Sequence, residues 1–384
     1  MTASTATNAP RRRPKDRKNQ IIHQARDLFV ERGYPNVSMA LIAERVGITA
    51  GALYRHFDNK SSLLEAVVAE SFIYLDQPVT QPRLDAALDQ AIDVLEDHPN
   101  LSELWARETL YLPEEARATL RRRMRVWAHA FIPPLHQQRS DLDAGQEELI
   151  AWGIQSALAF LGSSSSRTPA LHRRPVVRCA ALALADAELV PTGEPVPGAV
   201  RSLWPVSTRE KLLIAAIDLF AETGYRETPM AAIGAAAHVT GPNLYTHFEN
   251  KADLLRAVFE RAIHSLWLNL DTALRTSQTS AEALEKLVVG HVQLAATWAR
   301  VGSDVIGEPD IEESTRASQR EYIAEWTALV REVCPDLELR EARLRVLIAF
   351  SVINHLRRTP HISTFDTFPE NVARLALAVL RANR

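Results

Sequence analysis

The stretch after Gly47 combines a short predicted helix with hydrogen-bond donors and small outward side chains. Thr49 is placed to cap the helix, and Leu53 and Phe57, four residues apart, face the core and brace it. The outward-facing residues are Ala50, Gly51, Ala52, Arg55 and the tip of Tyr54. The donors suited to phosphate oxygens are Thr49, Tyr54, His56 and Lys60. A short helix of this kind can insert its N-terminus into a major groove.

A second helix is predicted just before this one, beginning at Ser38, and Gly47 provides the turn between the two. Two helices joined in this way have the form of a helix-turn-helix. Each candidate contact also has a structural alternative. Tyr54 can simply pack against the helices, and His56 can be a histidine that is satisfied within the fold.

The whole pattern occurs twice. Residues 18–68 recur without a gap, 191 positions later, as residues 209–259, and 21 of the 51 aligned positions are identical. A period of this length is too large for a solenoid unit, so it predicts two whole domains in tandem. Two helix-turn-helix units in one chain supply what a DNA-binding dimer obtains from two chains.

Charge is distributed unequally between the two copies. Residues 10–60 hold eleven Lys and Arg against five Asp and Glu, a balance of +6, whereas residues 201–251 hold five of each sign. The basic arm at 1–14 includes Arg12 and Arg13, for which we expect minor-groove or backbone contact, with a solvated tail as the alternative. The first copy should therefore attract the phosphate backbone of DNA more strongly than the second.

The cysteines, the apolar runs and the sequence motifs exclude several classes of protein. Two isolated cysteines, Cys179 and Cys334, predict neither a disulfide framework nor a metal site, and we expect no cofactor. No run of apolar residues is long enough for a membrane span or a signal peptide, so a soluble cytoplasmic protein is expected. No catalytic signature is present, which argues against an enzyme.

Helical periodicity runs through both halves, so the predicted fold is all-α. Four prolines and two glycines mark a stiff linker near residues 191–205. The predicted segments are a basic arm (1–14), a first helix-turn-helix domain (15–66), a first helical regulatory domain (67–190), a linker (191–206), a second helix-turn-helix domain (207–257) and a second helical regulatory domain (258–384).

This pattern resembles the tetracycline-repressor (TetR-like) family of transcriptional regulators. The residues that carry the resemblance are Leu28-Phe29, Gly33-Tyr34, Ile42-Ala43, Val46-Gly47-Ile48-Thr49, Leu53-Tyr54-x-His56-Phe57, Asn59-Lys60 and Leu63-Leu64. The resemblance implies phosphate contacts at Thr49, Tyr54, His56 and Lys60, with Ala50, Gly51, Ala52 and Arg55 nearest the bases. It also implies a ligand-binding and dimerisation bundle after each helix-turn-helix. The tandem arrangement departs from the family's usual single-domain chain.

By the same resemblance, the last two helices of each half form a four-helix interface within one chain. We expect these helices at about 146–161 and 175–189 in the first half, and at about 341–357 and 369–381 in the second. The second copy departs from the family pattern, and its basic arm is missing. Its candidate DNA contacts are Thr240, Gly241, Asn243, Tyr245, Thr246, His247 and Lys251, and Asn243 has the chemistry to read adenine.

Aromatic residues with nearby polar groups mark candidate ligand sites in the regulatory helices. These are Trp105, Glu108, Tyr111, Trp127 and Trp152 in the first half, and His291, Trp298 and Trp326 in the second. For each aromatic taken singly, an ordinary core position is the alternative. The sequence does not identify the ligand.

Together these features predict a sequence-specific transcriptional regulator, a repressor released by a small hydrophobic effector. Its partners would be a double-stranded DNA operator and that effector, and its two halves would form a pseudo-dimer within the chain. The alternative is a ligand-binding or protein-interaction module whose second helix-turn-helix no longer contacts DNA.

Overall fold

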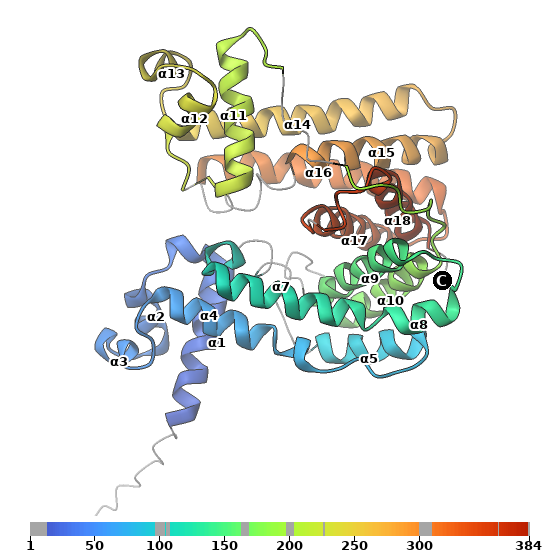
Figure 1. The fold of residues 1–384 in the computed structure, drawn as a ribbon, viewed down its shortest axis with the longest axis horizontal. Coiled ribbons are helices and arrows are strands. Elements are labelled where there is room, and N and C mark those ends of the chain that lie inside the picture. Colours follow the sequence, from blue (N-terminus) through green and yellow to red (C-terminus); the bar gives the residue numbers. More distant parts are fainter. Residues whose placement is uncertain are drawn as a thin grey trace, which may run out of the picture. The chain divides into compact units, whose positions relative to one another are not determined.

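The computed structural model describes residues 14–96, 104, 108–162, 169–196, 203–225, 227–298, 309–359 and 361–382. Within these ranges the regular structure is helical, and strand-like pairing is limited to one bridge between Pro195 and Phe365. The predicted all-α fold is therefore confirmed (Figure 1). No helix in these ranges is long and apolar enough to cross a membrane. The chain divides into two compact units, residues 1–73 with 103–121, and residues 74–102 with 122–384.

The first unit contains the first helix-turn-helix. Its elements are α1 (Pro14–Arg32), η1 (Tyr34–Asn36), α2 (Met39–Val46), α3 (Ala50–Tyr54), α4 (Lys60–Ser71), η3 (Glu108–Tyr111) and the first half of α7 (Glu114–His129). A side-chain cap and a glycine set the two ends of α2. Ser38 Oγ accepts the backbone N–H of Leu41 at 3.1 Å and so caps α2. Gly47 ends α2 in the left-handed region, at φ 72°, where a side chain would be strained.

The second unit contains the remaining helices. They are η2 (Ile73–Asp76, which straddles the division), α5 (Leu84–Glu96), the rest of α7, α8 (Ile132–Gln138), α9 (Ala144–Ala159), η4 (Phe160–Gly162), α10 (Ala170–Ala185), α11 (Thr208–Thr223), α12 (Met230–Ala236), α13 (Gly241–His247), α14 (Lys251–Arg275), α15 (Ser280–Trp298), α16 (Pro309–Val333), α17 (Leu339–Arg357) and α18 (Phe368–Arg381). Helices α11 to α13 repeat the order of α1 to α3.

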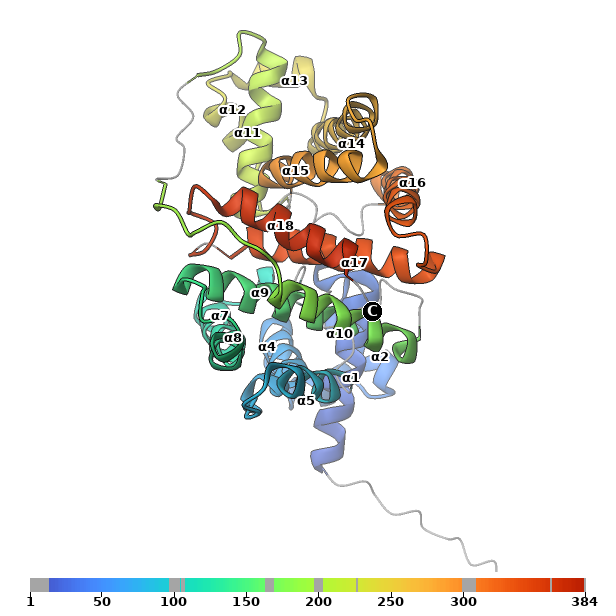
Figure 2. The same ribbon diagram turned by 90° about the vertical axis from the view of Figure 1, so that its right-hand side faces the viewer.

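Within this unit, α9 and α10 of the first half pack against α17 and α18 of the second (Figure 2). Alanine, leucine and valine side chains fill the contact. The predicted helix start at residue 175 was wrong, because α10 begins at Ala170 and contains Pro175. Burial of Val177, Ala181 and Leu184 offsets the backbone hydrogen bond that a proline inside a helix removes.

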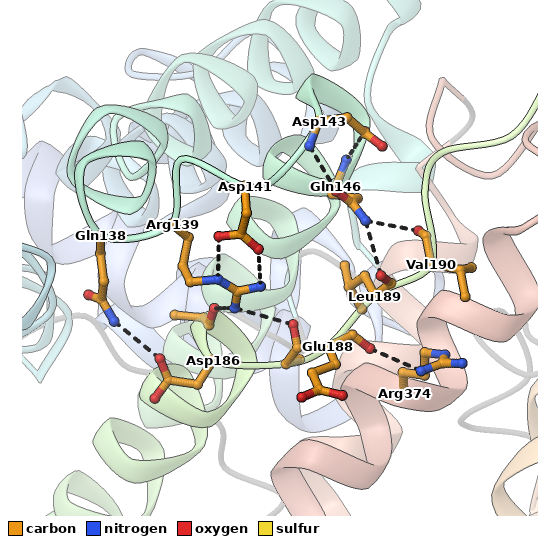
Figure 3. A network of polar contacts seen from close by, with 12 residues as sticks. Gln138, Arg139, Asp141, Asp143, Gln146, Asp186, Glu188, Leu189, Val190 and Arg374 are labelled. Atoms are coloured by element: carbon orange, nitrogen blue, oxygen red, sulfur yellow. Dashed lines mark hydrogen bonds and ion pairs between the residues drawn. The ribbon is translucent and has the colours of Figure 1, made fainter.

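Residues 187–196, called the strap below, connect this four-helix contact to the second half. Gln146 Nε2 donates to the carbonyl oxygens of Leu189, at 3.1 Å, and Val190, at 3.0 Å (Figure 3). From the second half, Asn371 Nδ2 donates to the same Val190 carbonyl at 3.0 Å, and its Oδ1 accepts the Val190 N–H at 2.9 Å. Both halves therefore hold one peptide group of the strap.

The rest of the strap is fixed in the same way. The Thr192 N–H donates to the carboxylate of Asp143, the cap of α9, at 2.7 Å. Further along, the Gly193 N–H donates to Thr367 Oγ1 at 3.0 Å, and the Val196 N–H donates to the Thr364 carbonyl at 2.7 Å. The start of the predicted linker is thus bound to both halves along its length and is not a free spacer.

Candidate DNA-binding site

Helix α3 presents the outward face that the sequence predicts. Thr49 Oγ1 accepts the Ala52 N–H at 3.2 Å and caps the helix, while Leu53 is fully buried beneath it. Tyr54 is 51% exposed, so its hydroxyl has access to solvent and to a ligand. Arg55 is exposed as well, and His56 is half-buried. The face therefore offers a guanidinium, a phenol and an imidazole beside a helix N-terminus.

Gly51 has no role in the packing of the domain itself. A Cβ at this position would meet no atom within 4 Å, and the backbone is not in the left-handed region. Gly241, near the start of the corresponding helix in the second half, is equally open. Because internal packing does not require these glycines, their small size suits the close approach of an external surface.

Lys60 and Lys251, for which the sequence predicts phosphate contacts, donate hydrogen bonds within their own domains. Lys60 Nζ donates to the carbonyl oxygens of Tyr34, at 2.8 Å, and Val37, at 2.9 Å, and lies 4.1 Å from the centroid of the Tyr34 ring. Lys251 repeats this arrangement with the carbonyls of Tyr225, at 2.9 Å, and Thr228, at 3.0 Å. Each ammonium group thus ties the start of the following helix to the loop before the helix-turn-helix.

The loop that Lys60 holds is also held from the regulatory segment of the first unit. The buried carboxylate of Glu108 accepts the Tyr34 N–H at 2.9 Å, and the Tyr111 ring stacks on the Tyr34 ring at 5.2 Å between centroids. Burial raises the pKa of the Tyr34 hydroxyl. The structure therefore places two predicted ligand-binding residues against the helix-turn-helix. Tyr34 belongs to the family pattern and recurs as Tyr225, but the sequence alone assigned it no role in the site.

The second helix-turn-helix keeps the framework of the first. Leu244 and Phe248 are buried beneath α13, and Tyr245 is 56% exposed, close to the value for Tyr54. The guanidinium of Arg209 lies 5.1 Å from the centroid of the Phe248 ring, as Lys18 lies 5.4 Å from that of Phe57. The duplicated sequence has therefore kept the packing that presents the outward face.

The outward face of α13, the candidate reading face of the second copy, differs from that of α3 in its side chains. Thr240 precedes α13, but its side chain makes no capping hydrogen bond. Thr246 Oγ1 donates to the Asn243 carbonyl at 2.6 Å, and both side chains are exposed together with His247. His238 occupies the turn position of Gly47 at φ 55°, a conformation that costs an L-residue about 1 kcal/mol. The copy therefore retains an outward Asn–Thr pair but carries no Lys or Arg on this helix.

The arm directly before the second domain, residues 203–206, is apolar. Leu203 and Trp204 stand where the first half has Arg12 and Arg13, which lie outside the described residues. Leu203 is 83% exposed, and the Trp204 ring approaches His238 edge-on, with 6.4 Å between centroids. This arm offers no charge to phosphate.

The predicted ligand-binding residues of the regulatory domains do not form one set. Trp127 is buried and packs edge-on against the rings of Tyr74 and Phe131, at 5.3 and 5.2 Å between centroids. Trp152 lies elsewhere in the second unit, with its ring 5.8 Å from that of His355 in the second half. Trp105 and the side chain of Trp298 lie outside the described residues.

In the second half, the structure does bring predicted residues together. His291 stacks on Phe350 at 4.7 Å and meets Trp326 edge-on at 5.3 Å between centroids. The Tyr322 hydroxyl lies 3.4 Å from His291 Nδ1. Burial lowers the pKa of His291 to about 4 and raises that of Tyr322 to about 12, so both side chains are neutral near pH 7. These four residues are called the aromatic cluster below.

Comparison with known proteins agrees with the duplicated site. The model of the family described as "Bacterial regulatory proteins, tetR family" matches residues 21–67 and again residues 212–258. The Transposon Tn10 TetC protein of Escherichia coli is 39% identical over 66 residues, which cover 17% of this chain and 34% of TetC. The transcriptional activator FasR of Mycolicibacterium smegmatis is 38% identical over 80 residues, which cover 21% of this chain and 36% of FasR. The matches thus span about a third of these relatives.

Among solved structures, this chain is similar to the ketosteroid transcriptional regulator KstR2 of Mycobacterium tuberculosis, with a TM-score of 0.41. The two are 17% identical in sequence, and the match covers 46% of this chain and 95% of KstR2. The family is one of regulatory proteins and not of enzymes, in line with the sequence prediction. The family motif falls in each half on the helices that carry the reading face. The chain is therefore a tandem TetR-like protein, with one helix-turn-helix domain of the tetR family of bacterial regulatory proteins in each half.

Proposed function

We propose that the chain is a DNA-binding transcriptional repressor whose two halves pair within one molecule and engage a single operator. The observation that carries this proposal is the strap. It leads directly from the last helix of the first half into contacts with the second, and both halves donate to its Val190 carbonyl. Such a connection gives the halves a high effective concentration for each other, so a second chain is unnecessary.

On the first half-site, Thr49, Tyr54 and His56 bind phosphate oxygens, and Arg55 reads a base edge. Ala50, Gly51 and Ala52 allow the helix N-terminus to approach the groove closely. On the second, Tyr245, His247 and Thr240 serve as phosphate donors, while Asn243 and Thr246 face the bases beside Gly241. Arg12 and Arg13 add backbone contacts in the first half alone. Since the two reading faces differ, the operator has two unlike half-sites.

A small hydrophobic effector releases the repressor. Support for a route from effector to DNA comes from Glu108 and Tyr111, which lie in the regulatory segment yet hold Tyr34. Tyr34 is in turn held by Lys60 at the start of α4. A shift of the Glu108 segment would therefore disturb the loop that leads into α2 of the helix-turn-helix. In the second half, the aromatic cluster around His291 is the candidate effector region, with Trp326 as its most buried ring.

One observation favours the alternative in which the second helix-turn-helix does not contact DNA. Its arm exposes Leu203 and Val206, at 83% and 97%, where the first copy has basic residues. An apolar arm beside an uncharged reading helix suits a protein surface better than a phosphate backbone. In that case only the first half would set the sequence preference.

The test is selection of bound duplexes from a random DNA pool, followed by measurement of the number of chains per duplex. The proposal expects one chain on a site with two different half-sites, and affinity that falls steeply with salt. A single half-site per chain would support the alternative. Strict palindromes occupied by two chains, or absence of any preferred sequence, would reject both.

A further inference from the structure

Helix α9 carries a group of buried polar atoms without partners. Among the described residues, Trp152 Nε1, both amide atoms of Gln155 and Ser156 Oγ make no hydrogen bond. The three residues are 4%, 1% and 0% exposed. Leaving a buried donor or acceptor unpaired costs roughly 1–3 kcal/mol. Within the part of the chain that the structure describes, no group compensates this cost, so an external molecule is the candidate partner.

These side chains share one side of α9. Positions three and four residues apart are neighbours on a helix surface, which places Gln155 and Ser156 next to Trp152. The Trp152 ring lies 5.8 Å from that of His355 and 5.7 Å from that of His361, both in the second half. The carbonyl of Ser156 accepts from Ser351 Oγ of α17 at 3.5 Å. A molecule bound beside this side of α9 would therefore lie close to both halves.

The chemistry of the group selects a neutral ligand. An indole N–H, a carboxamide and a hydroxyl together donate and accept, which suits an amide or an alcohol. Glu148 lies one turn before Trp152, and hydrogen bonds from His361 and His129 lower its pKa to about 2, so it is ionised. Arg125 also pairs with Glu148, at 3.3 Å, so an anion bound here would compete with Glu148 for the same partners, and burial of an unpaired charge is costly.

The second half shows that the fold does not require an indole or an amide at two of these three positions, although Ser156 corresponds to the polar Asn354. Counted from the matching segments 149–151 and 347–349, Trp152 corresponds to Phe350 and Gln155 to Ile353. Ile353 is 1% exposed, so an apolar side chain is fully buried at the corresponding position of α17. The polar Gln155 is therefore specific to the first half, and packing of the helix does not require it.

We propose that Trp152, Gln155 and Ser156 form a site for the neutral polar end of a small, mostly apolar molecule, held between α9 and the second half. This inference rests on the proposed effector response and specifies the effector's chemical class for the first half. The second half, with Phe350 and Ile353 at the matching positions, lacks this site. The site is therefore a feature of the first half alone.

The test uses octanamide as the probe, with octanoate as its charged counterpart, titrated calorimetrically into the full chain without DNA. Octanamide binds to the unmodified chain, and octanoate binds at least about tenfold more weakly. Gln155→Ile, which introduces the residue of the second half, weakens octanamide binding about tenfold, the size expected from one or two lost hydrogen bonds. The same variant without probe unfolds roughly 2 °C higher, because an unpaired buried amide is gone.

Trp152→Phe provides a second variant, with an expected loss of about fivefold in octanamide affinity. The proposal is overturned if octanamide does not bind, if Gln155→Ile leaves its affinity unchanged, or if Gln155→Ile unfolds at a lower temperature. The last result would show that the amide is satisfied within the protein or by a fixed water. Since no DNA is present, these outcomes are independent of operator binding, which the duplex selection measures separately.

Discussion

Gln146 and Asn371, one from each half of the chain, donate to the same carbonyl oxygen, that of Val190, and both do so at 3.0 Å. A carbonyl has two lone pairs, and here each is used by a different half. The crossover between the halves is therefore part of their interface. In a dimer of separate chains no such covalent crossover exists.

The first prediction concerns this crossover. Asn371→Leu removes both hydrogen bonds to Val190, so the free energy of unfolding should fall by about 1–3 kcal/mol. Thermal unfolding of the full chain measures this change. Arg374→Leu is the matched control, since its 3.3 Å contact with the Glu188 carbonyl and its 2.8 Å ion pair with Glu370 are both exposed, and their loss should cost less than about 1 kcal/mol.

The second prediction is that the halves stay together when the chain is cut. A protease site introduced between residues 198 and 201 lies beyond the strap, so cleavage leaves the contacts of Gln146 and Asn371 in place. Size-exclusion chromatography should show one particle of unchanged size. Two separate monomers after cleavage would mean that the pseudo-dimer interface is too weak to act within one chain.

The third prediction distinguishes base recognition by Arg55 from a general effect of its positive charge on DNA binding. Arg55→Ala should cost about 1–3 kcal/mol in operator binding and relax the preference at one position of the first half-site. Arg45→Ala is the control, because it removes the same charge from an arginine that is paired with Glu31. Asn243→Ala should relax a position in the second half-site. If Asn243→Ala leaves the selected sequences unchanged, the second helix-turn-helix does not read DNA.

The fourth prediction decides the role of Lys60. If its ammonium group holds the Tyr34 and Val37 carbonyls, Lys60→Ala lowers the unfolding temperature but leaves the salt dependence of DNA binding nearly unchanged. A phosphate contact would instead reduce the salt slope by about 1. Lys251→Ala should behave in the same way in the second half. The measurements are thermal unfolding and DNA affinity at several salt concentrations.

The fifth prediction concerns acid sensitivity. Burial lowers the pKa of His291 to about 4, so the unfolded chain binds a proton there between pH 6.5 and 4 while the folded chain does not. Stability contributed by neutral His291 is therefore full above pH 6.5 and is lost as the pH falls to 4, on the order of 3 kcal/mol. His291→Gln should remove about half of this pH dependence, because burial also lowers the pKa of His355 to about 4 and that residue contributes over the same range. His264→Gln, at an exposed position, should not.

The sequence alone determined the duplication, the all-α class and the reading helices. These features depend on local spacing: caps, a turn glycine and apolar residues three and four apart specify a helix-turn-helix wherever they occur. Leu53 and Phe57 were placed correctly on the core side for this reason. The exposed positions of Arg55 and Tyr54 follow from the same periodicity.

Only the tertiary structure decided where long side chains point and which distant residues meet. Lys60 has the chemistry of a phosphate donor, but its ammonium group donates to the carbonyl oxygens of Tyr34 and Val37 instead. The contact of Glu108 with Tyr34 spans 74 residues, and that of Asn371 with Val190 spans 181. No local pattern encodes such pairs, because a hydrogen bond depends on the position in space of its acceptor, which the packing of the whole chain sets.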